Sequence, residues 1–112
     1  MEISTTDHRS DIAVISLAGR LDLLSAPAVK ARLNEEVQRG RRRLVVDLGA
    51  VTMIDSSGLG ALIGGLKAAR LASGDLRLAR TQEQAQSILR LTMLDRVLTT
   101  YGTAEEAVAA YE

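Results

Sequence analysis

The chain has little to support most kinds of catalytic or metal site. It contains no cysteine, which excludes disulfide bonds, thiolate zinc sites and cysteine nucleophiles. His8 is the only histidine, so a histidine-based catalytic triad would have to use it. Tyr101 and Tyr111 are the only aromatic residues, which leaves few rings for stacking nucleic-acid bases. The core of a folded domain must therefore be aliphatic.

The chain also lacks an excess of charge and a long apolar run. Fourteen basic and fourteen acidic residues give a formal net charge of zero, so no overall field attracts DNA or an anionic membrane. No apolar run approaches the roughly 18 residues of a membrane span, and no secretory signal is visible. We expect a cytoplasmic protein without membrane insertion or direct nucleic-acid binding. A content of 46% hydrophobic residues over 112 positions indicates one globular domain, residues 1–112.

Apolar runs predict strands that alternate with helices. The strands are expected at residues 2–6, 12–18, 44–48, 76–79 and 97–101. One helix is expected to begin after Ser25, which would act as its N-cap, and a second is expected over 59–71. Two further helices are expected to begin at capping boxes, one formed by Thr81 with Gln84 and the other by Thr103 with Glu106. The order β-β-α-β-α-β-α-β-α predicts an α/β domain with a mostly parallel sheet. Function in such sheets gathers at the carboxyl ends of the strands, where both 19–22 and 53–60 fall.

The segment Asp55-Ser56-Ser57-Gly58 allows two interpretations. A serine or aspartate at the start of a helix can simply cap it, which contributes about 1 kcal/mol. The same position suits a phosphorylation site, because free N–H groups and the helix dipole stabilise a phosphate there. A phosphate would add about −1.5 to −2 charges to a surface on which a partner could dock.

Four glycines in or beside the helix that follows need an explanation, since each costs about 0.8–1 kcal/mol relative to alanine in a helix interior. They are Gly58, Gly60, Gly64 and Gly65. Close packing on the sheet would explain one or two of them, and a smooth docking surface would explain the rest. A nucleotide-binding P-loop is not indicated, because the pattern G-x-x-x-x-G-K-S/T is absent.

Other charged groups give weaker signals. Asp22 and Asp55 together could bind a metal or carry out acid–base chemistry, but nothing else in the sequence supports a substrate pocket. We therefore expect no enzyme activity, no metal site and no cofactor. The basic run formed by Arg39 and 41–43 is expected to be a solvated loop at the end of the sheet opposite Ser56.

Two blocks of sequence resemble the STAS domain family, and in particular its bacterial anti-sigma factor antagonists. The first block is Leu44 to Gly60 with its Asp55-Ser56-Ser57-Gly58 centre, and the second is Gly19-Arg20-Leu21-Asp22. A likeness from Ile88 to Ala107 extends the resemblance over nearly the whole chain. The resemblance implies a single compact domain of the STAS fold, with about five strands flanked by about four helices.

The resemblance also implies a partner-switching function. The unphosphorylated protein would bind an anti-sigma factor that is itself a serine kinase of the histidine-kinase-like ATPase superfamily, and so release the sigma factor. Phosphorylation of Ser56, or as second choice Ser57, would end the binding, and a serine phosphatase would restore it. Partner binding would involve the residues that match the two blocks: Asp22, Asp55, Ser57, Gly58, Leu59 and Gly60. The alternative is a STAS subunit that acts as a docking module in a stressosome or a membrane transport assembly.

Overall fold

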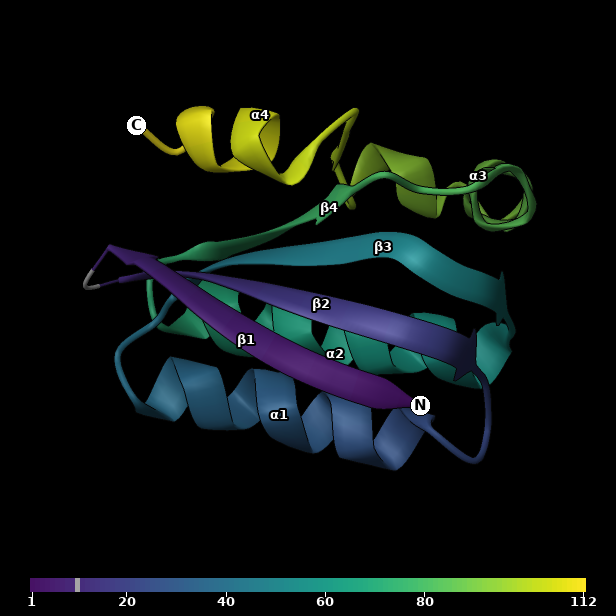
Figure 1. Ribbon diagram of the computed structural model, residues 1–112, viewed down its shortest axis with the longest axis horizontal. Helices are drawn as coiled ribbons and strands as arrows, with labels where there is room; N and C mark the ends of the chain where they lie inside the picture. The colour runs from purple at the N-terminus through teal and green to yellow at the C-terminus, as the bar shows by residue number, and fades with distance from the viewer. Residues whose placement is uncertain (10) are drawn as a thin grey trace.

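The computed structural model describes residues 1–9 and 11–112, and it contains one five-stranded sheet in the order β1-β2-β3-β4-β5 (Figure 1). Strand β1 (Glu2–Arg9) pairs antiparallel with β2 (Ile12–Leu21). Strands β2, β3 (Arg43–Ile54), β4 (Asp75–Ala79) and β5 (Thr100–Tyr101) are parallel to one another. The expected order of strands and helices and the mostly parallel sheet are confirmed.

The helices cover both faces of the sheet. Helices α1 (Ala26–Gln38) and α2 (Ser56–Leu71) lie side by side on one face, and α4 (Ala104–Ala109) lies on the other (Figure 1). Helix α3 (Glu83–Leu91) contributes to the same aliphatic core as α1 and α2, followed by a short 3-10 helix, η1 (Leu94–Arg96). Among the described residues, none of the helices is both long and apolar enough to cross a membrane.

All five strands differ in length from the sequence expectations, and among them β1 extends to Arg9 and β4 begins at Asp75. Gly19 does not end β2, because its positive φ of 112° is absorbed in an irregularity of the pairing with β3, and the strand continues to Leu21. Strand β3 does not stop at residue 48 but continues to Ile54, where it pairs with Leu21. The last strand is shorter than expected: residues 94–96 form η1, and only Thr100–Tyr101 pair with β4.

At two helices, residues that were expected to form the N-terminal cap make other contacts instead. Gln82 occupies the N-cap position of α3 without a side-chain capping bond, and the expected Thr81–Gln84 box does not form because the Gln84 amide binds strand β3. Ser25 occupies the N-cap position of α1, but its hydroxyl accepts from the Asp22 N–H and donates to the Arg20 carbonyl instead of capping the helix. Thr103 does cap α4, accepting from the Glu106 N–H at 3.1 Å.

The basic run is not simply solvated, although it lies at the end of the sheet opposite Ser56. Arg41 pairs with Asp7 at 2.9 Å, and Arg43 pairs with Asp11 at 3.4 Å. This Arg41 guanidinium lowers the pKa of the Asp7 carboxyl by a side-chain hydrogen bond. These pairs lie at the end of the sheet where the parallel strands begin, and they connect the arginines to two acidic residues that are distant in sequence.

Candidate functional site

Ser56 and Ser57 are the first two residues of helix α2, directly after the end of strand β3. Asp55 is the N-cap: its backbone is extended, and its Oδ1 atom accepts a hydrogen bond from the Gly58 N–H at 2.9 Å. The carboxylate therefore does the capping, and neither serine hydroxyl makes a hydrogen bond within the described part of the chain. Ser56 is exposed and Ser57 is half-buried.

The loop that follows β2 lies against this helix start, as the sequence predicted for the two blocks. The Asp55 N–H donates to the Leu21 carbonyl at 3.2 Å, and the Asp55 Oδ2 atom accepts from the Leu23 N–H at 3.1 Å. Asp22 holds the same loop from within, since its Oδ1 atom accepts from the Leu24 N–H at 3.1 Å. One carboxylate, Asp55, thus connects the end of β3, the first turn of α2 and the β2–α1 loop.

The two aspartates are engaged with backbone donors rather than arranged as metal ligands. Asp22 and Asp55 each accept from two main-chain N–H groups, and Arg20 lies 3.5 Å from the Asp22 carboxylate. No cluster of three or more potential metal-ligating side chains forms among residues 1–9 and 11–112. Asp55 fixes the loop and the helix start relative to one another, and Asp22 fixes the loop internally.

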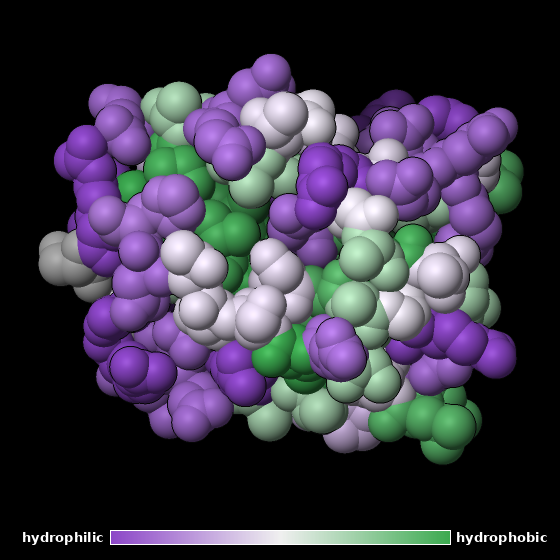
Figure 2. All heavy atoms as spheres, in the orientation of Figure 1, coloured by the Kyte–Doolittle hydropathy of each residue, from purple (hydrophilic) through white to green (hydrophobic). Residues whose placement is uncertain are grey.

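Apolar groups surround the helix start. Leu23 and Leu24 are 69% and 89% exposed, in a loop held rigid by the bonds described above. An apolar patch is visible over this loop at the lower right of Figure 2. Beside it, a shallow groove of about 420 Å³ runs between α1 and α2. Its lining residues are Leu23, Ala26, Pro27, Lys30, Ser57, Gly60 and Ala61. The combination of exposed leucines and a groove is suited to docking another protein.

The four glycines of α2 fall into two groups. A Cβ atom at Gly58 would overlap the Leu21 carbonyl oxygen, and one at Gly65 would lie 2.5 Å from Leu33 Cδ1, so close packing requires both glycines. A Cβ at Gly64 would approach only the flexible Lys30 side chain, and one at Gly60 would meet nothing within 4 Å. The expectation that packing explains one or two of the four glycines is confirmed.

The residues predicted to bind a partner are not equally accessible. Gly60 is exposed, and Asp22, Asp55 and Ser57 are half-buried. Gly58 and Leu59 are buried, and the Leu59 side chain, 4% exposed, packs into the core beneath the surface. Leu23 and Leu24 were missed by the sequence reasoning, although two consecutive leucines in a polar loop are a signal that could have been used.

Gln84 was also missed as a contact of this site. Its amide group accepts from the Ile54 N–H at 2.9 Å and donates to the Ile54 carbonyl at 2.9 Å. A residue of α3 therefore binds the last residue of β3, immediately before Asp55. The sequence pattern Thr-x-x-Gln suggested a local cap instead, and nothing local to Gln84 indicated a partner 30 positions away.

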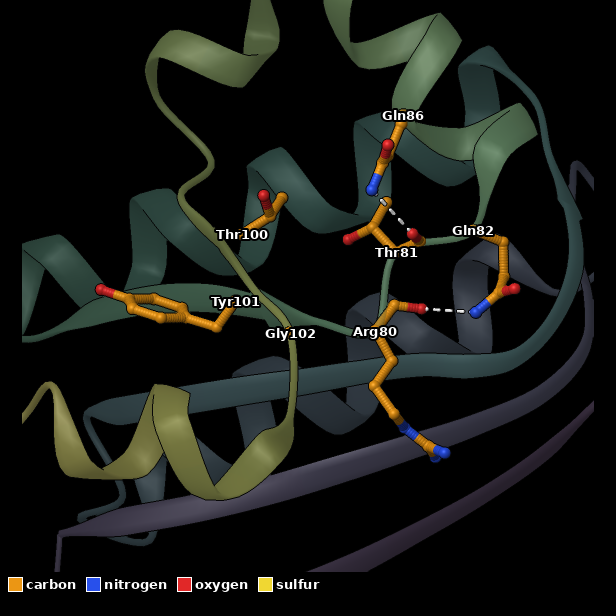
Figure 3. Close-up of a pocket in the computed structure, with 7 residues that line it drawn as sticks. All are labelled: Arg80, Thr81, Gln82, Gln86, Thr100, Tyr101 and Gly102. Atoms are coloured by element: carbon orange, nitrogen blue, oxygen red, sulfur yellow. Dashed lines mark hydrogen bonds between the residues drawn. The ribbon is translucent and has the colours of Figure 1, made fainter.

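A second hollow, of about 430 Å³, lies at the ends of β4 and β5 (Figure 3), and it shares no lining residue with the groove beside Ser57. Figure 3 shows the Arg80 side chain pointing away from the other lining residues, and its guanidinium binds Asp47 through two bonds of 2.9 Å. The Asp47 hydrogen bond raises the pKa of Arg80, and the pair leaves no uncompensated charge there. The hollow is of similar size to the groove beside Ser57, but it lacks the exposed apolar side chains of that groove.

Comparisons with known proteins agree with this architecture. The STAS domain family model matches residues 4–107. The anti-sigma-B factor antagonist of Bacillus subtilis (strain 168) is 27% identical over 108 residues, which cover 96% of this chain and 97% of that protein. The crystal structure of an anti-sigma factor antagonist from Mycobacterium paratuberculosis is 26% identical and has a TM-score of 0.82, covering 97% of this chain and 93% of that one.

The structure of the anti-sigma factor antagonist SpoIIAA in its unphosphorylated form has a TM-score of 0.85 at 19% identity, covering 98% of this chain and 96% of that one. The Bacillus protein SpoIIAA in its phosphorylated form has a TM-score of 0.78, also at 19% identity, covering 99% and 100% of the two chains. At this identity the likeness concerns the fold.

Proposed function

The chain belongs to the STAS domain family, and we propose that it is an anti-sigma factor antagonist switched by phosphorylation of Ser56. The observation that carries the proposal is an exposed serine at the start of α2, beside two exposed leucines, whose hydroxyl has no hydrogen-bond partner among residues 1–9 and 11–112. The relatives named above as anti-sigma factor antagonists match this chain over nearly its full length, which supports the same role here.

The proposed partner is an anti-sigma factor that is also a serine kinase of the histidine-kinase-like ATPase superfamily. The unphosphorylated chain binds this kinase through the surface formed by Leu23, Leu24, Gly60 and the groove between α1 and α2, and the sigma factor is released. A serine phosphatase returns the phosphorylated chain to its binding form. The chain itself acts by binding in the cytoplasm, without catalysis, a metal or a cofactor of its own.

Ser56 is the better candidate for phosphorylation than Ser57. Ser56 is exposed and its hydroxyl has no partner among the described residues, so a kinase can reach it without breaking a native bond. Ser57 is half-buried and lines the groove, where a phosphate would have to displace part of the surface. The carboxylates of Asp22 and Asp55 lie near the helix start, so a phosphate of about −2 charge would add to an already negative surface.

A pull-down from the native cell, followed by incubation with ATP, tests this proposal. We expect the wild-type chain to capture a serine kinase and to gain one phosphate by mass spectrometry. Ser56→Ala should gain none, whereas the matched control Ser57→Ala should be phosphorylated normally. Ser56→Asp should bind the kinase at least tenfold more weakly, because it places a charge on the docking surface.

The outcomes separate the proposal from its alternatives. Normal phosphorylation of Ser56→Ala would assign the modification to another residue. Capture of stressosome or transport subunits, with no kinase bound, would favour the docking-module function instead.

A further inference from the structure

Among the described residues, no strand lies beside the second half of β3 on the side of β4. The ladder between β3 and β4 ends at the pair Asp47 and Ala79, while β3 continues for seven more residues to Ile54. On the side of β2 the pairing continues to Leu21 and Ile54. The final residues of β3, which lead directly into Asp55 and Ser56, are therefore held by a strand on one edge only.

The side chain of Gln84 takes the place of the missing strand at Ile54. Its carboxamide accepts from the Ile54 N–H and donates to the Ile54 carbonyl, both at 2.9 Å, which is the pair of bonds that a neighbouring strand would make. Ile54 itself is 1% exposed, so its backbone groups would have limited access to water without this partner.

The Gln84 contact completes a set of anchors around the phosphorylatable serine. Asp55 is bound to Leu21 at the end of β2 and to Leu23 of the β2–α1 loop, and Ile54 is bound to Gln84 of α3. Ser56 has no side-chain hydrogen bond of its own within the described chain, so the position of its Oγ atom depends on the backbone that these anchors hold. Among these anchors, Gln84 alone belongs to α3.

We propose that Gln84 is a positioning residue for phosphoryl transfer to Ser56, an inference that rests on the function proposed above. Catalysis of phosphoryl transfer depends on placing the attacking oxygen in line with the transferred group and on electrostatic stabilisation of that group. In the transfer itself, the Ser56 oxygen forms a bond to the γ-phosphorus of ATP as the bond to ADP breaks, and the hydroxyl proton passes to a base of the kinase. Gln84 takes no part in this chemistry, but it fixes the start of α2 from which the hydroxyl projects.

The test compares Gln84→Ala with Gln86→Ala as a matched control. Gln86 lies in the same helix, and its amide donates to the Thr81 carbonyl at 3.0 Å without contacting β3 (Figure 3). The assay is steady-state phosphorylation by the serine kinase that the pull-down identifies. We expect kcat for Gln84→Ala to fall about tenfold, since small misplacement of a reacting group has effects of this size or larger. The KM should stay within about twofold, because the exposed docking leucines are unchanged, and Gln86→Ala should match the wild type.

Amide hydrogen exchange provides a readout that does not need the kinase. In Gln84→Ala, the Ile54 and Gly58 N–H groups should lose protection at least tenfold, while the core of β2 keeps its protection. Gln84→Glu is a second variant: its carboxylate can accept from the Ile54 N–H but cannot donate to the carbonyl, so it should also lower kcat.

The possible results distinguish this inference from the proposed function. Wild-type chain that takes no phosphate from a bound kinase would overturn the proposed function, and the role of Gln84 with it. Wild-type chain that is phosphorylated at Ser56, with Gln84→Ala and Gln84→Glu phosphorylated at the same kcat, would overturn the role of Gln84 alone. A rise in KM at unchanged kcat would also overturn it, because it would place Gln84 in docking and not in positioning.

Discussion

Replacing Gly58 by alanine is expected to destabilise the protein by about 2 kcal/mol. A Cβ atom there would overlap the Leu21 carbonyl oxygen, lie 2.8 Å from Leu21 Cγ and lie 3.0 Å from Ile54 Cγ1. The carbonyl has little freedom to move, because it belongs to β2 and accepts from the Asp55 N–H. Overpacking of this kind costs about 1–3 kcal/mol, and we take the upper value because the contact is with backbone. The better helix propensity of alanine returns at most about 1 kcal/mol.

Gly60→Ala is the matched control, two residues further along the same helix. A Cβ at Gly60 meets nothing within 4 Å, so only the gain in helix propensity remains, and the variant should be more stable by about 0.5–1 kcal/mol. The two single-methyl substitutions should therefore differ by nearly 3 kcal/mol, with opposite signs relative to the wild type.

Urea unfolding and thermal unfolding, both followed by circular dichroism, measure this difference. At about 4 °C per kcal/mol for a chain of this size, the melting temperature of Gly58→Ala should fall by about 8 °C, and that of Gly60→Ala should rise by a few degrees. Equal unfolding midpoints for the two variants would refute the argument from packing. The helix start would then be able to move away from β2, and the anchoring role given to Asp55 would need revision.

Three further substitutions test separate parts of the structure. Asp55→Ala removes two hydrogen bonds to backbone N–H groups and should cost about 1–2 kcal/mol in urea unfolding; an unchanged midpoint would show that neither bond matters. Burial raises the pKa of Tyr111, so the stability that this phenol contributes is present below pH 10 and is lost as the pH rises further; Tyr111→Phe should make the free energy of unfolding less dependent on pH above about pH 10. Leu24→Ala should weaken kinase binding about tenfold, or about 1.4 kcal/mol, with no change in unfolding, and equal affinity by calorimetry would remove Leu24 from the docking surface.

The sequence predicted the architecture well because it is encoded in local periodicity. Apolar runs and helical spacing gave the order of the elements, and the topology of a parallel sheet then placed 19–22 and 53–60 at one edge. The bonds between Asp55 and the β2–α1 loop bear out that placement. The ends of the strands were less predictable, since Gly19 can either stop a strand or be absorbed within it, and only the pairing with β3 decides between the two.

Contacts between residues far apart in sequence could not be predicted in the same way. Thr81 and Gln84 have the spacing of a capping box, yet the Gln84 amide binds Ile54 because β4 ends early and leaves that backbone without a partner. Arg41 likewise pairs with Asp7, 34 positions away. A long polar side chain can form hydrogen bonds or ion pairs with several possible partners. The folded backbone determines which of these partners lie close enough to bind.

The local structure around Ser56 explains how a phosphate could change binding without changing the fold. Asp55, and not a serine, caps α2, so within the part of the chain that the structure describes the Ser56 hydroxyl carries no native bond that modification would break. The phosphate would stand at the positive end of a 16-residue helix, which offsets part of its repulsion from the Asp55 carboxylate. A partner that covers the exposed leucines would have to bury the phosphate charge, and nothing comparable to the helix dipole would offset that cost. A penalty of about 3 kcal/mol there would weaken binding more than a hundredfold. If the modified serine also capped the helix, its phosphorylation would remove the cap and destabilise the fold. Because Asp55 caps the helix instead, the proposed phosphorylation of Ser56 would leave the cap intact.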